Sequence, residues 1–284
     1  MSNVAPAVSM TEREFPMSDK NFNTIAEVAY KYTGIKLPEQ KRQMIYSRIA
    51  RRIRALNLAN FDQYCALIVD SKHEEFNEFI NAITTNLTSF FRENHHFEYL
   101  ESTVLPQFKK SHISSRKLRV WSAGCSTGEE PYSIAMTLLK NFGSSTNWDL
   151  KILATDLDSN VVTTGRNGVY AADRVNGLDP ALVKKWFVSN ADNTRFEMID
   201  EAKKLIQFNR LNLLDGWPMK NKFDIIFCRN VVIYFDKPTQ KKLFDRYADQ
   251  LNDGGYLIIG HSESLHKLTD RFESIGKTIY RKLA

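Results

Sequence analysis

A glycine-containing stretch in the middle of the chain has residue types that suit a nucleotide-like ligand. It reads Trp-Ser-Ala-Gly-Cys-Ser-Thr-Gly-Glu-Glu-Pro over residues 121–131 and follows the apolar run Leu118–Trp121. Gly124 and Gly128 would let the backbone approach a ligand closely, at the strand end where parallel sheets bind such ligands. The stretch lacks the three glycines of the dinucleotide fingerprint and the lysine of a P-loop.

Two acidic residues, Glu129 and Glu130, begin the helix that is expected after this loop. Acidic side chains at a helix N-terminus can simply complement the helix dipole. They would also repel a pyrophosphate. They therefore favour a cofactor that carries hydroxyl groups and a positive charge.

Asp156 and Asp158 follow the next predicted strand, Leu150–Thr155. An acidic residue at the tip of the second strand usually holds a ribose diol, because a carboxylate accepts hydrogen bonds from two hydroxyls. Asp156 is the better candidate because it comes first after the strand. Asp158, which precedes Ser159, is more typical of a helix N-cap.

The stretch Phe227–Asp236 places polar residues within an apolar run at the end of the fourth predicted strand, Phe223–Cys228. Arg229, Asn230 and Tyr234 would need partners if buried, and a ligand could supply them. The alternative is that Asn230 satisfies a local turn and Tyr234 belongs to the core. An amino-group methylase of nucleic-acid bases would carry two prolines after this asparagine, where this chain has two valines.

The stretch Thr84–His96 precedes the expected sheet and could fold over its ligand cleft as a lid. Arg92 could pair there with a carboxylate, although arginine more often lies on a solvated surface. His95 and His96 are adjacent, so we expect them to point to different sides of a helix and to make poor joint metal ligands. We predict no metal site.

A basic helix lies near the N-terminus, between Lys41 and Arg54. At about 100° per residue, Lys41, Arg48 and Arg52 share one flank of its apolar stripe, and Arg51 lies behind them. Such a row could bind acidic side chains on another helix, or it could be a solvated face. Aromatic residues do not interleave with these charges, as binding to single-stranded nucleic acid would favour.

The predicted elements that would position these residues form two parts. The N-terminal part is helical, and in the C-terminal part strands and helices alternate. Helical spacing predicts four helices before Thr85, the first capped by Ser18 and the second spanning Glu39–Leu56. A helix with Phe97 and Phe108 follows. The alternation of strands and helices in the C-terminal part indicates a doubly wound parallel sheet. Its remaining predicted elements are helices 131–142 and 239–251, strands 205–208 and 256–260, and a C-terminal hairpin of strands 272–275 and 278–281 that adds antiparallel strands.

Residues 169–204 interrupt this alternation of strands and helices. We predict that they form an inserted subdomain with a strand at Arg195–Ile199. We expect that strand to be exposed, so that a peptide could add to it as a further strand. The predicted domains are a flexible tail (1–17), a helical domain (18–85) and a sheet domain with the insert (86–284).

Composition narrows the class of protein. The chain has 284 residues, 43% apolar and 25% charged, as in globular proteins, with a net charge of +6. It shows neither a membrane-length apolar stretch nor a secretory signal near Met1, and its three cysteines are too scattered for a disulfide framework. We therefore expect a cytoplasmic protein.

Taken together, the motifs resemble those of the CheR family, the glutamate methyltransferases of bacterial chemoreceptors. The resemblance runs from about Phe22 to the C-terminus, and only residues 1–16 lie outside it. The stretches that carry it are 51–56 (Arg-Arg-Ile-Arg-Ala-Leu), 85–92 (Thr-Asn-Leu-Thr-Ser-Phe-Phe-Arg), 126–133 (Ser-Thr-Gly-Glu-Glu-Pro-Tyr-Ser) and 227–235 (Phe-Cys-Arg-Asn-Val-Val-Ile-Tyr-Phe).

This resemblance implies an α/β class I methyltransferase fold, with a mixed seven-stranded sheet, an N-terminal all-α domain and a small inserted β-subdomain. It also implies S-adenosylmethionine as cofactor and S-adenosylhomocysteine as product. Asp156 would hold the ribose, Asn212 and Leu213 would lie near adenine, and Arg92 and Tyr234 would flank the transferred methyl. The cofactor contacts it implies are Asn86, Thr88, Arg92, Glu130, Asp156, Asn212, Leu213, Arg229 and Asn230.

The resemblance further implies partners. The basic helix, with Lys41, Arg48, Arg51 and Arg52, would face the acidic helical bundle of a chemoreceptor. The insert would dock a receptor's C-terminal tether peptide, as in some members of the family. The protein would be a cytoplasmic monomer, recruited to membrane receptor arrays without entering the membrane and without binding nucleic acid.

The proposed chemistry agrees with the residues. A glutamate carboxylate has a reference pKa of about 4.3, so it is already an anion at neutral pH and needs no general base. Aligning it with an activated methyl is then proximity catalysis. Three alternatives stay open: a nucleic-acid methyltransferase, which suits the net positive charge, a non-catalytic receptor adaptor, and a nicotinamide oxidoreductase, which the glycine spacing and Glu129 and Glu130 oppose.

Overall fold

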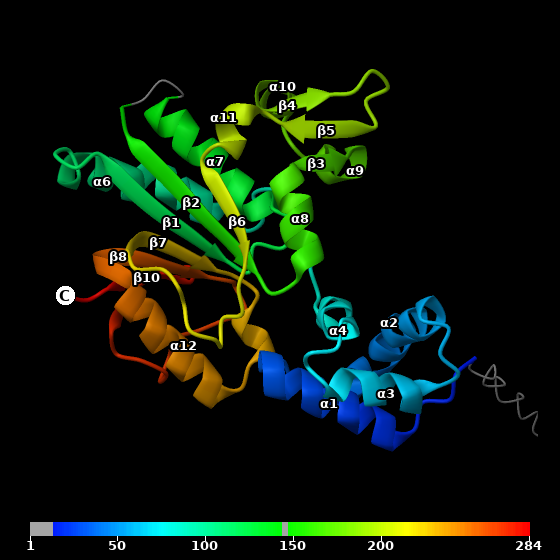
Figure 1. Ribbon diagram of the computed structural model, residues 1–284. Coiled ribbons are helices and arrows are strands. Elements are labelled where there is room, and N and C mark those ends of the chain that lie inside the picture. The colour runs from blue at the N-terminus through cyan, green and yellow to red at the C-terminus, as the bar shows by residue number, and fades with distance from the viewer. Residues whose placement is uncertain (1–13, 144–146) are drawn as a thin grey trace, which may run out of the picture. The chain divides into compact units, whose positions relative to one another are not determined.

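The computed structural model describes residues 14–143 and 147–284 (Figure 1). The first thirteen residues of the predicted tail lie outside this part. The chain separates into two compact units, one that ends at Ile83 and one that begins at Thr84. Each unit is described by itself.

The first unit is all helical. Its elements are α1 (Asp19–Thr33), a 3₁₀ turn (Glu39–Lys41), α2 (Arg42–Ala55), α3 (Phe61–Val69) and α4 (Glu75–Ile83). Ser18 caps α1 as predicted, because its hydroxyl accepts a hydrogen bond from the Asn21 amide at 3.1 Å. Ile25, Ile49 and Phe61 are fully buried and belong to the core of this unit. Met17 is also buried, so the residue just before the cap packs with this unit.

The second unit is built on a mixed seven-stranded sheet, as predicted. Its order is β6-β2-β1-β7-β8-β10-β9. The five strands from β6 to β8 are parallel to their neighbours, and β10 is antiparallel to both β8 and β9. The strands are β1 (Lys117–Ala123), β2 (Asp149–Asp156), β6 (Ile206–Arg210), β7 (Phe223–Cys228), β8 (Leu251–Ile259), β9 (Phe272–Gly276) and β10 (Ile279–Lys282).

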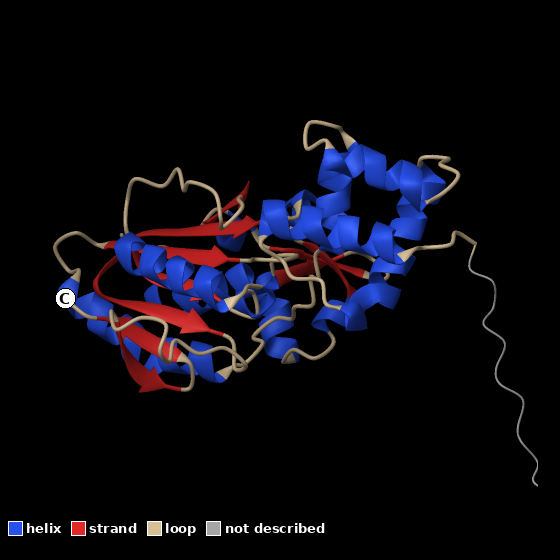
Figure 2. Ribbon diagram, turned by 90° about the horizontal axis from the view of Figure 1, so that it is seen from below, coloured by secondary structure: helices blue, strands red, loops and turns tan. Residues whose placement is uncertain are grey.

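Both faces of this sheet are buried. Side chains of a strand alternate between the two faces, so each strand contributes to two cores. Ile225 and Phe227 of β7 pack in one core, which includes α7 (Glu129–Phe142). Ile226 and Cys228 pack in the other, with α12 (Lys237–Gln250). Helix α8 (Ser159–Asn167) contacts β2 and β6. Helices flank the strands in both views (Figures 1 and 2). This arrangement is why the strands read as continuous apolar runs.

Two local predictions needed correction. The helix expected around Phe97 and Phe108 is divided into α5 (His95–Tyr99), a π-helical turn (Leu100–Val104) and α6 (Leu105–Ser111). Pro106, which lacks an N–H group, follows the widened turn and accounts for the interruption. In the C-terminal hairpin, Lys277 and Thr278 both have positive φ and form the turn, so β10 begins at Ile279.

The insert forms a separate three-stranded antiparallel sheet. It contains β3 (Val169–Ala171), α9 (Ala172–Val175), α10 (Pro180–Trp186), β4 (Phe187–Ser189), β5 (Arg195–Met198) and α11 (Asp200–Lys203). The strand order is β3-β5-β4. Because β5 pairs with strands on both sides, the prediction that a peptide could add to Arg195–Ile199 is wrong. The outer strands are β3 and β4.

No helix within residues 14–143 and 147–284 is both long enough and apolar enough to cross a lipid bilayer.

Candidate active site

The predicted chemistry-bearing loops meet at one edge of the main sheet. The parallel strands β1, β2, β6 and β7 all end at this edge. Their ends and the loops that follow them carry residues 124–128, 156–158, 211–213 and 229–234. The direction of strand order changes between β1 and β7, which is the position where open α/β sheets bind ligands.

The two glycines of the β1 loop are required by its packing against the protein. Both have positive φ, 96° at Gly124 and 99° at Gly128. A Cβ atom at Gly124 would lie 2.3 Å from a methyl of Val231, and one at Gly128 would lie 2.8 Å from the Cα of Gly165. The loop is thus held tightly between neighbouring segments. Its backbone N–H groups at 124 and 125 both donate to the Thr155 carbonyl at the end of β2.

Asp156 lies beside this loop. The sequence predicts it to follow the second strand, and the structure makes it the last residue of β2. It accepts hydrogen bonds from the backbone N–H groups of Ser126 at 2.8 Å and Asp158 at 3.1 Å. Burial raises its pKa to about 6, although these backbone donors act in the opposite direction. A carboxylate has about four acceptor positions, so this side chain retains capacity to bind hydroxyl groups of a ligand.

Asp158 is the N-cap of α8, so the cap interpretation is confirmed. One carboxylate oxygen accepts from the amides of Asn160 and Val161. The other accepts from the Thr84 hydroxyl at 2.9 Å and the Asn86 amide at 2.7 Å. Asn86, a predicted cofactor contact, therefore connects the segment before the sheet to this cap.

The segment 84–93, which the sequence predicts as a lid, contacts the β1 loop and α7. The Ser126 hydroxyl donates to the Asn86 carbonyl at 2.8 Å, and the Phe91 amide donates to Ser133 Oγ at 2.9 Å. Arg174 of the insert donates to the Thr88 carbonyl at 3.0 Å. Arg92 donates from Nη1 to the Leu87 carbonyl at 2.8 Å, a backbone partner instead of the expected carboxylate.

The two acidic residues at the start of α7 are buried and each pairs with an arginine. Glu129 binds Arg174 and accepts from the Thr127 hydroxyl. Glu130 accepts from Ser122 Oγ at 2.7 Å and lies 3.1 Å from Nη1 of Arg229. Burial raises the pKa of Glu130, and the Arg229 charge opposes that rise. These contacts go beyond a simple complement to the helix dipole.

The loop after β7 is held in its conformation by Glu263, a residue that the sequence did not single out. Asn230 has a φ of 59°, a left-handed conformation that asparagine tolerates better than most residues. Its amide donates to Oε2 of Glu263 at 3.0 Å. Glu263 follows β8 and is buried, and burial raises its pKa although backbone N–H groups act against this. Tyr234 lies in a short 3₁₀ turn, Val232–Tyr234, in the same loop.

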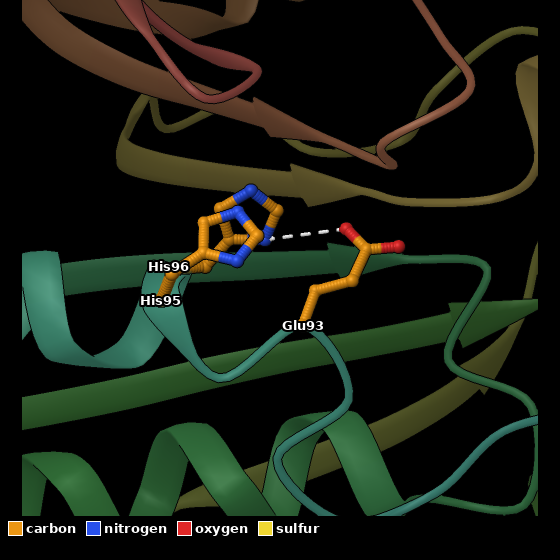
Figure 3. Close-up of side chains that lie close together, drawn as sticks. All are labelled: Glu93, His95 and His96. Atoms are coloured by element: carbon orange, nitrogen blue, oxygen red, sulfur yellow. Dashed lines mark ion pairs between the residues drawn. The ribbon is translucent and has the colours of Figure 1, made fainter.

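Glu93, His95 and His96 form a compact cluster beside this loop (Figure 3). The prediction that the two histidines diverge is wrong, because their ring centroids are 4.1 Å apart. The cluster's possible ligand atoms all lie within 4.8 Å of one another. However, Nη2 of Arg229 lies 3.4 Å from Glu93 Oε2, so a positive charge already faces this carboxylate and would repel a metal cation.

The cluster is better explained as an anchor for Arg229. Burial alone would raise the pKa of Glu93, but the hydrogen bond with His261 and the charge of Arg229 lower it to about 2. Burial and the Arg229 charge lower the pKa of His96 to about 4, so His96 is neutral at pH 7. Nε of Arg229 is buried and has no hydrogen-bond partner among the described residues. A bound ligand could provide one.

Asn212 and Leu213 follow β6, as predicted, but their groups have partners inside the protein. Asn212 Oδ1 accepts from the Leu214 amide at 3.0 Å. The Leu213 side chain is buried in the core with α12. Its carbonyl accepts from Trp217 Nε1 and Arg246 Nη1.

Comparison with known proteins agrees with this geometry. The family described as "CheR methyltransferase, SAM binding domain" matches residues 86–281, and "CheR methyltransferase, all-alpha domain" matches residues 20–84. This chain belongs to the CheR methyltransferase family. The resemblance seen in the sequence is thereby confirmed, as is the α/β fold with an all-α N-terminal domain.

Similar CheR proteins match this chain over nearly their whole length. A probable chemotaxis protein methyltransferase of Rhizobium etli is 44% identical, covering 89% of this chain and 96% of the relative. Chemotaxis protein methyltransferase 2 of Pseudomonas aeruginosa is 40% identical over 99% of both chains. The chemotaxis protein methyltransferase of Escherichia coli is 39% identical, covering 96% of this chain and 94% of the relative.

The site of this CheR protein fits S-adenosylmethionine. The cofactor has a ribose diol, an amino group and a sulfonium, so it offers hydroxyl donors and positive charge. Asp156 and Glu130 provide carboxylates at the sheet edge, and Asp156 retains acceptor capacity. The unpartnered Nε of Arg229 can bind an acceptor such as the cofactor's carboxylate. The observed donor and acceptor set therefore matches the cofactor's groups.

The predicted partner residues of this CheR protein belong to its helical unit. Arg52 donates from Nε and Nη2 to Glu75, at 2.8 and 2.6 Å, and is therefore already paired. Arg48 donates to the Ala82 carbonyl at 3.1 Å. Burial lowers the pKa of Lys41, and the nearby charge of Arg48 adds to this. Arg51 is exposed and donates to the Ser47 carbonyl.

Proposed function

We propose that this protein transfers a methyl group from S-adenosylmethionine to glutamate side chains of chemoreceptors, forming methyl esters. The observation that carries the proposal is the sheet edge where Asp156 bonds to the glycine loop and Glu130 pairs with Arg229, in a chain of the CheR family. The names of the relatives, chemotaxis protein methyltransferases, support the receptor as substrate.

In this proposal the cofactor lies along the carboxyl ends of β1, β2, β6 and β7. Bound S-adenosylmethionine supplies a methyl group already activated by its sulfonium. Asp156 would hold the ribose, and Glu130 with Arg229 would hold the amino acid portion. The other contacts would come from segment 84–92 and from the loops after β6 and β7, through Asn86, Thr88, Arg92, Asn212, Leu213 and Asn230.

Arg92 and Tyr234 would orient the acceptor carboxylate. Arginine has five N–H donors, so the bond from Arg92 to the Leu87 carbonyl leaves donors for a carboxylate. The acceptor is an anion at neutral pH, so alignment is the main requirement. Binding it too tightly would weaken it as a nucleophile.

The receptor's acidic helical bundle would contact the basic helix α2. Arg51 is the most available cation of the predicted set, because it is exposed and its described partner is a backbone carbonyl of its own helix. Lys41 and Arg48 would add charge. Arg52 would contribute less directly, since Glu75 neutralises it.

A receptor tether peptide would bind the insert at the edge of β4. A groove of about 480 Å³ adjoins this strand and is lined by Phe187, Phe196, Leu178 and Val183. Such a groove could receive an apolar side chain of a peptide that pairs with β4. We expect a cytoplasmic monomer that receptor arrays recruit through these contacts.

The test is release of base-labile methyl groups. The protein is mixed with methyl-labelled S-adenosylmethionine and a cytoplasmic chemoreceptor fragment, then treated with mild alkali. Volatile methanol would establish a carboxyl ester. Label that survives alkali on the receptor would indicate N-methylation and contradict the proposed acceptor. Absence of label despite bound cofactor would contradict the proposed substrate.

A further inference from the structure

The turn Gly260–Glu263, which follows β8, contains none of the residues expected to bind the cofactor or the acceptor. The Glu263 side chain is buried, and its carboxylate faces three backbone N–H groups. It accepts from Gly260 at 2.6 Å, from Asn230 at 3.0 Å and from Ile233 at 3.3 Å. Two of these three donors belong to the loop after β7. A side chain of one loop therefore fixes the backbone of another.

The loop that Glu263 holds is in an unfavourable conformation. Asn230 has a left-handed backbone conformation, which is strained for a residue other than glycine. The end of β8 is shaped to receive it, because a Cβ at Gly260 would lie 2.5 Å from Asn230 Nδ2 and 2.8 Å from its backbone nitrogen. Such strain persists only where surrounding groups hold the residue in that conformation. Glu263 holds Asn230 by accepting the hydrogen bond from its backbone N–H group.

The same turn also contacts the segment on the other side of the site. His261 Nδ1 lies 2.7 Å from Glu93 Oε1, next to Arg92. The turn thus contacts both segments that carry the residues expected to orient the acceptor, Arg92 in one and Tyr234 in the other.

We propose that Glu263 is a positioning residue for methyl transfer. It acts through the backbone of Asn230 and Ile233 and fixes the loop that presents Arg229, Asn230 and Tyr234. This inference rests on the proposed function, since it assigns the loop a part in that reaction. Replacing the carboxylate by an amide would place an NH₂ donor against N–H donors and leave at least one of them unpaired.

A buried carboxylate can also serve stability alone, and Asp224 provides the matched control. It lies near the amino end of the same strand, β7, and is buried as well. It accepts from the Arg119 amide and from the Asn252 side chain, both at 2.8 Å. Asp224→Asn should destabilise the fold without disturbing the site.

The experiment compares Glu263→Gln, Glu263→Asp and Asp224→Asn in the full chain. It measures the single-turnover methyl transfer rate at saturating cofactor, the affinity for S-adenosylhomocysteine, thermal unfolding, and hydrogen exchange of the amides of residues 230 and 233. Glu263→Gln should lower the rate about tenfold and speed exchange at both amides. Glu263→Asp, which keeps the charge, should recover part of the rate. Asp224→Asn should lower the melting temperature yet keep the rate within about twofold.

Equal rate losses in Glu263→Gln and Asp224→Asn would overturn the inference, because stability alone would then explain both. A wild-type rate in Glu263→Gln with released amides would overturn it too. If Glu263→Gln does not fold, the rate and exchange of Glu263→Asp decide in the same way. If the wild type methylates no receptor, the proposed function fails separately. In that case the affinity for S-adenosylhomocysteine decides: a loss in Glu263→Gln that is absent in Asp224→Asn would still support the positioning role, and unchanged affinity in both variants would refute it.

Discussion

Two buried regions of this molecule hold carboxylates in different ways. In the helical unit, Glu75 accepts from Arg52 Nε and Nη2 and from the Tyr64 hydroxyl at 2.9 Å. Its charge is neutralised and its oxygens are bonded to side chains of the same unit. At the edge of the sheet, Asp156 accepts from backbone N–H groups, and burial raises its pKa to about 6.

The difference separates a carboxylate that stabilises a fold from one that is prepared for a ligand. An arginine partner repays the desolvation of Glu75 within the protein itself. Asp156 remains partly uncompensated, a state that is typical of functional sites. The left-handed residues Ser126 and Asn230 lie at the same edge, as strain at ligand sites often does. Four variants and conditions test this comparison, from the largest expected effect to the smallest.

Asp156→Ala should cause the largest loss of function. It removes the acceptor for two ribose hydroxyls, each worth roughly 1.5–3 kcal/mol, so affinity for S-adenosylhomocysteine should fall at least about 100-fold. Calorimetric titration measures it. Because a desolvated charge also disappears, the unliganded protein should unfold at no lower temperature than wild type. Equal affinity in variant and wild type would refute the ribose assignment.

Arg52→Ala should mainly destabilise the helical unit. It leaves Glu75 buried without its cation, and since Arg52 is partly exposed we expect a loss of about 2–3 kcal/mol in unfolding free energy. Denaturant unfolding measures it. The matched control is Arg51→Ala, which should change stability by less than about 0.5 kcal/mol. It should instead weaken binding to a receptor fragment. Equal stability of the two variants would remove the structural role given to Glu75.

The sequence predicted those parts of the fold that depend on local pattern. The mainly apolar runs 118–121, 150–155 and 223–228 each lie within a strand of the sheet, because a strand buried on both faces is mainly apolar. Asp156 was found because its position at the end of an apolar run is itself a local signal. The cap of α8 by Asp158 follows from the same kind of signal.

The contacts that were missed join residues far apart in the chain. Glu263 bonds to Asn230, His261 to Glu93, and Arg174 to Glu129. Each donor or acceptor has an ordinary surface residue type, and only the packing of separate loops brings the partners together. Arg52 was placed correctly on the flank of α2, but its partner Glu75 comes from another helix. The signal that could have pointed to Glu263 is its place just after the predicted strand 256–260, at the ligand edge.

The affinity of the wild type for S-adenosylhomocysteine should depend on pH through Asp156. Its pKa of about 6 means that it binds a proton as the pH falls through 6, and the neutral acid is a weaker acceptor of ribose hydroxyls. Affinity should be level above pH 7 and fall up to tenfold per unit below 6. Titrations from pH 5 to 8 measure this, and Asp156→Asn should flatten the profile. A level profile in the wild type would contradict the assignment.

Stability should change in the opposite direction over this range. The folded pKa of Asp156 exceeds the unfolded value of 3.8, so the folded state takes up the proton first and this residue's unfavourable contribution disappears as the pH falls below 6. The same protonation therefore weakens the ligand and relieves the fold.

Tyr234→Phe should give the smallest effect. The change removes one hydroxyl and keeps the ring, so the loop after β7 should retain its conformation through Glu263. If the hydroxyl orients the acceptor carboxylate, one hydrogen bond is lost, and turnover should fall severalfold while affinity for S-adenosylhomocysteine stays within about twofold. Steady-state kinetics with a receptor fragment measure the first quantity and calorimetry the second. A parallel loss of cofactor affinity would move Tyr234 from the acceptor side of the site to the cofactor side, and the comparison with Asp156 would then apply to both residues.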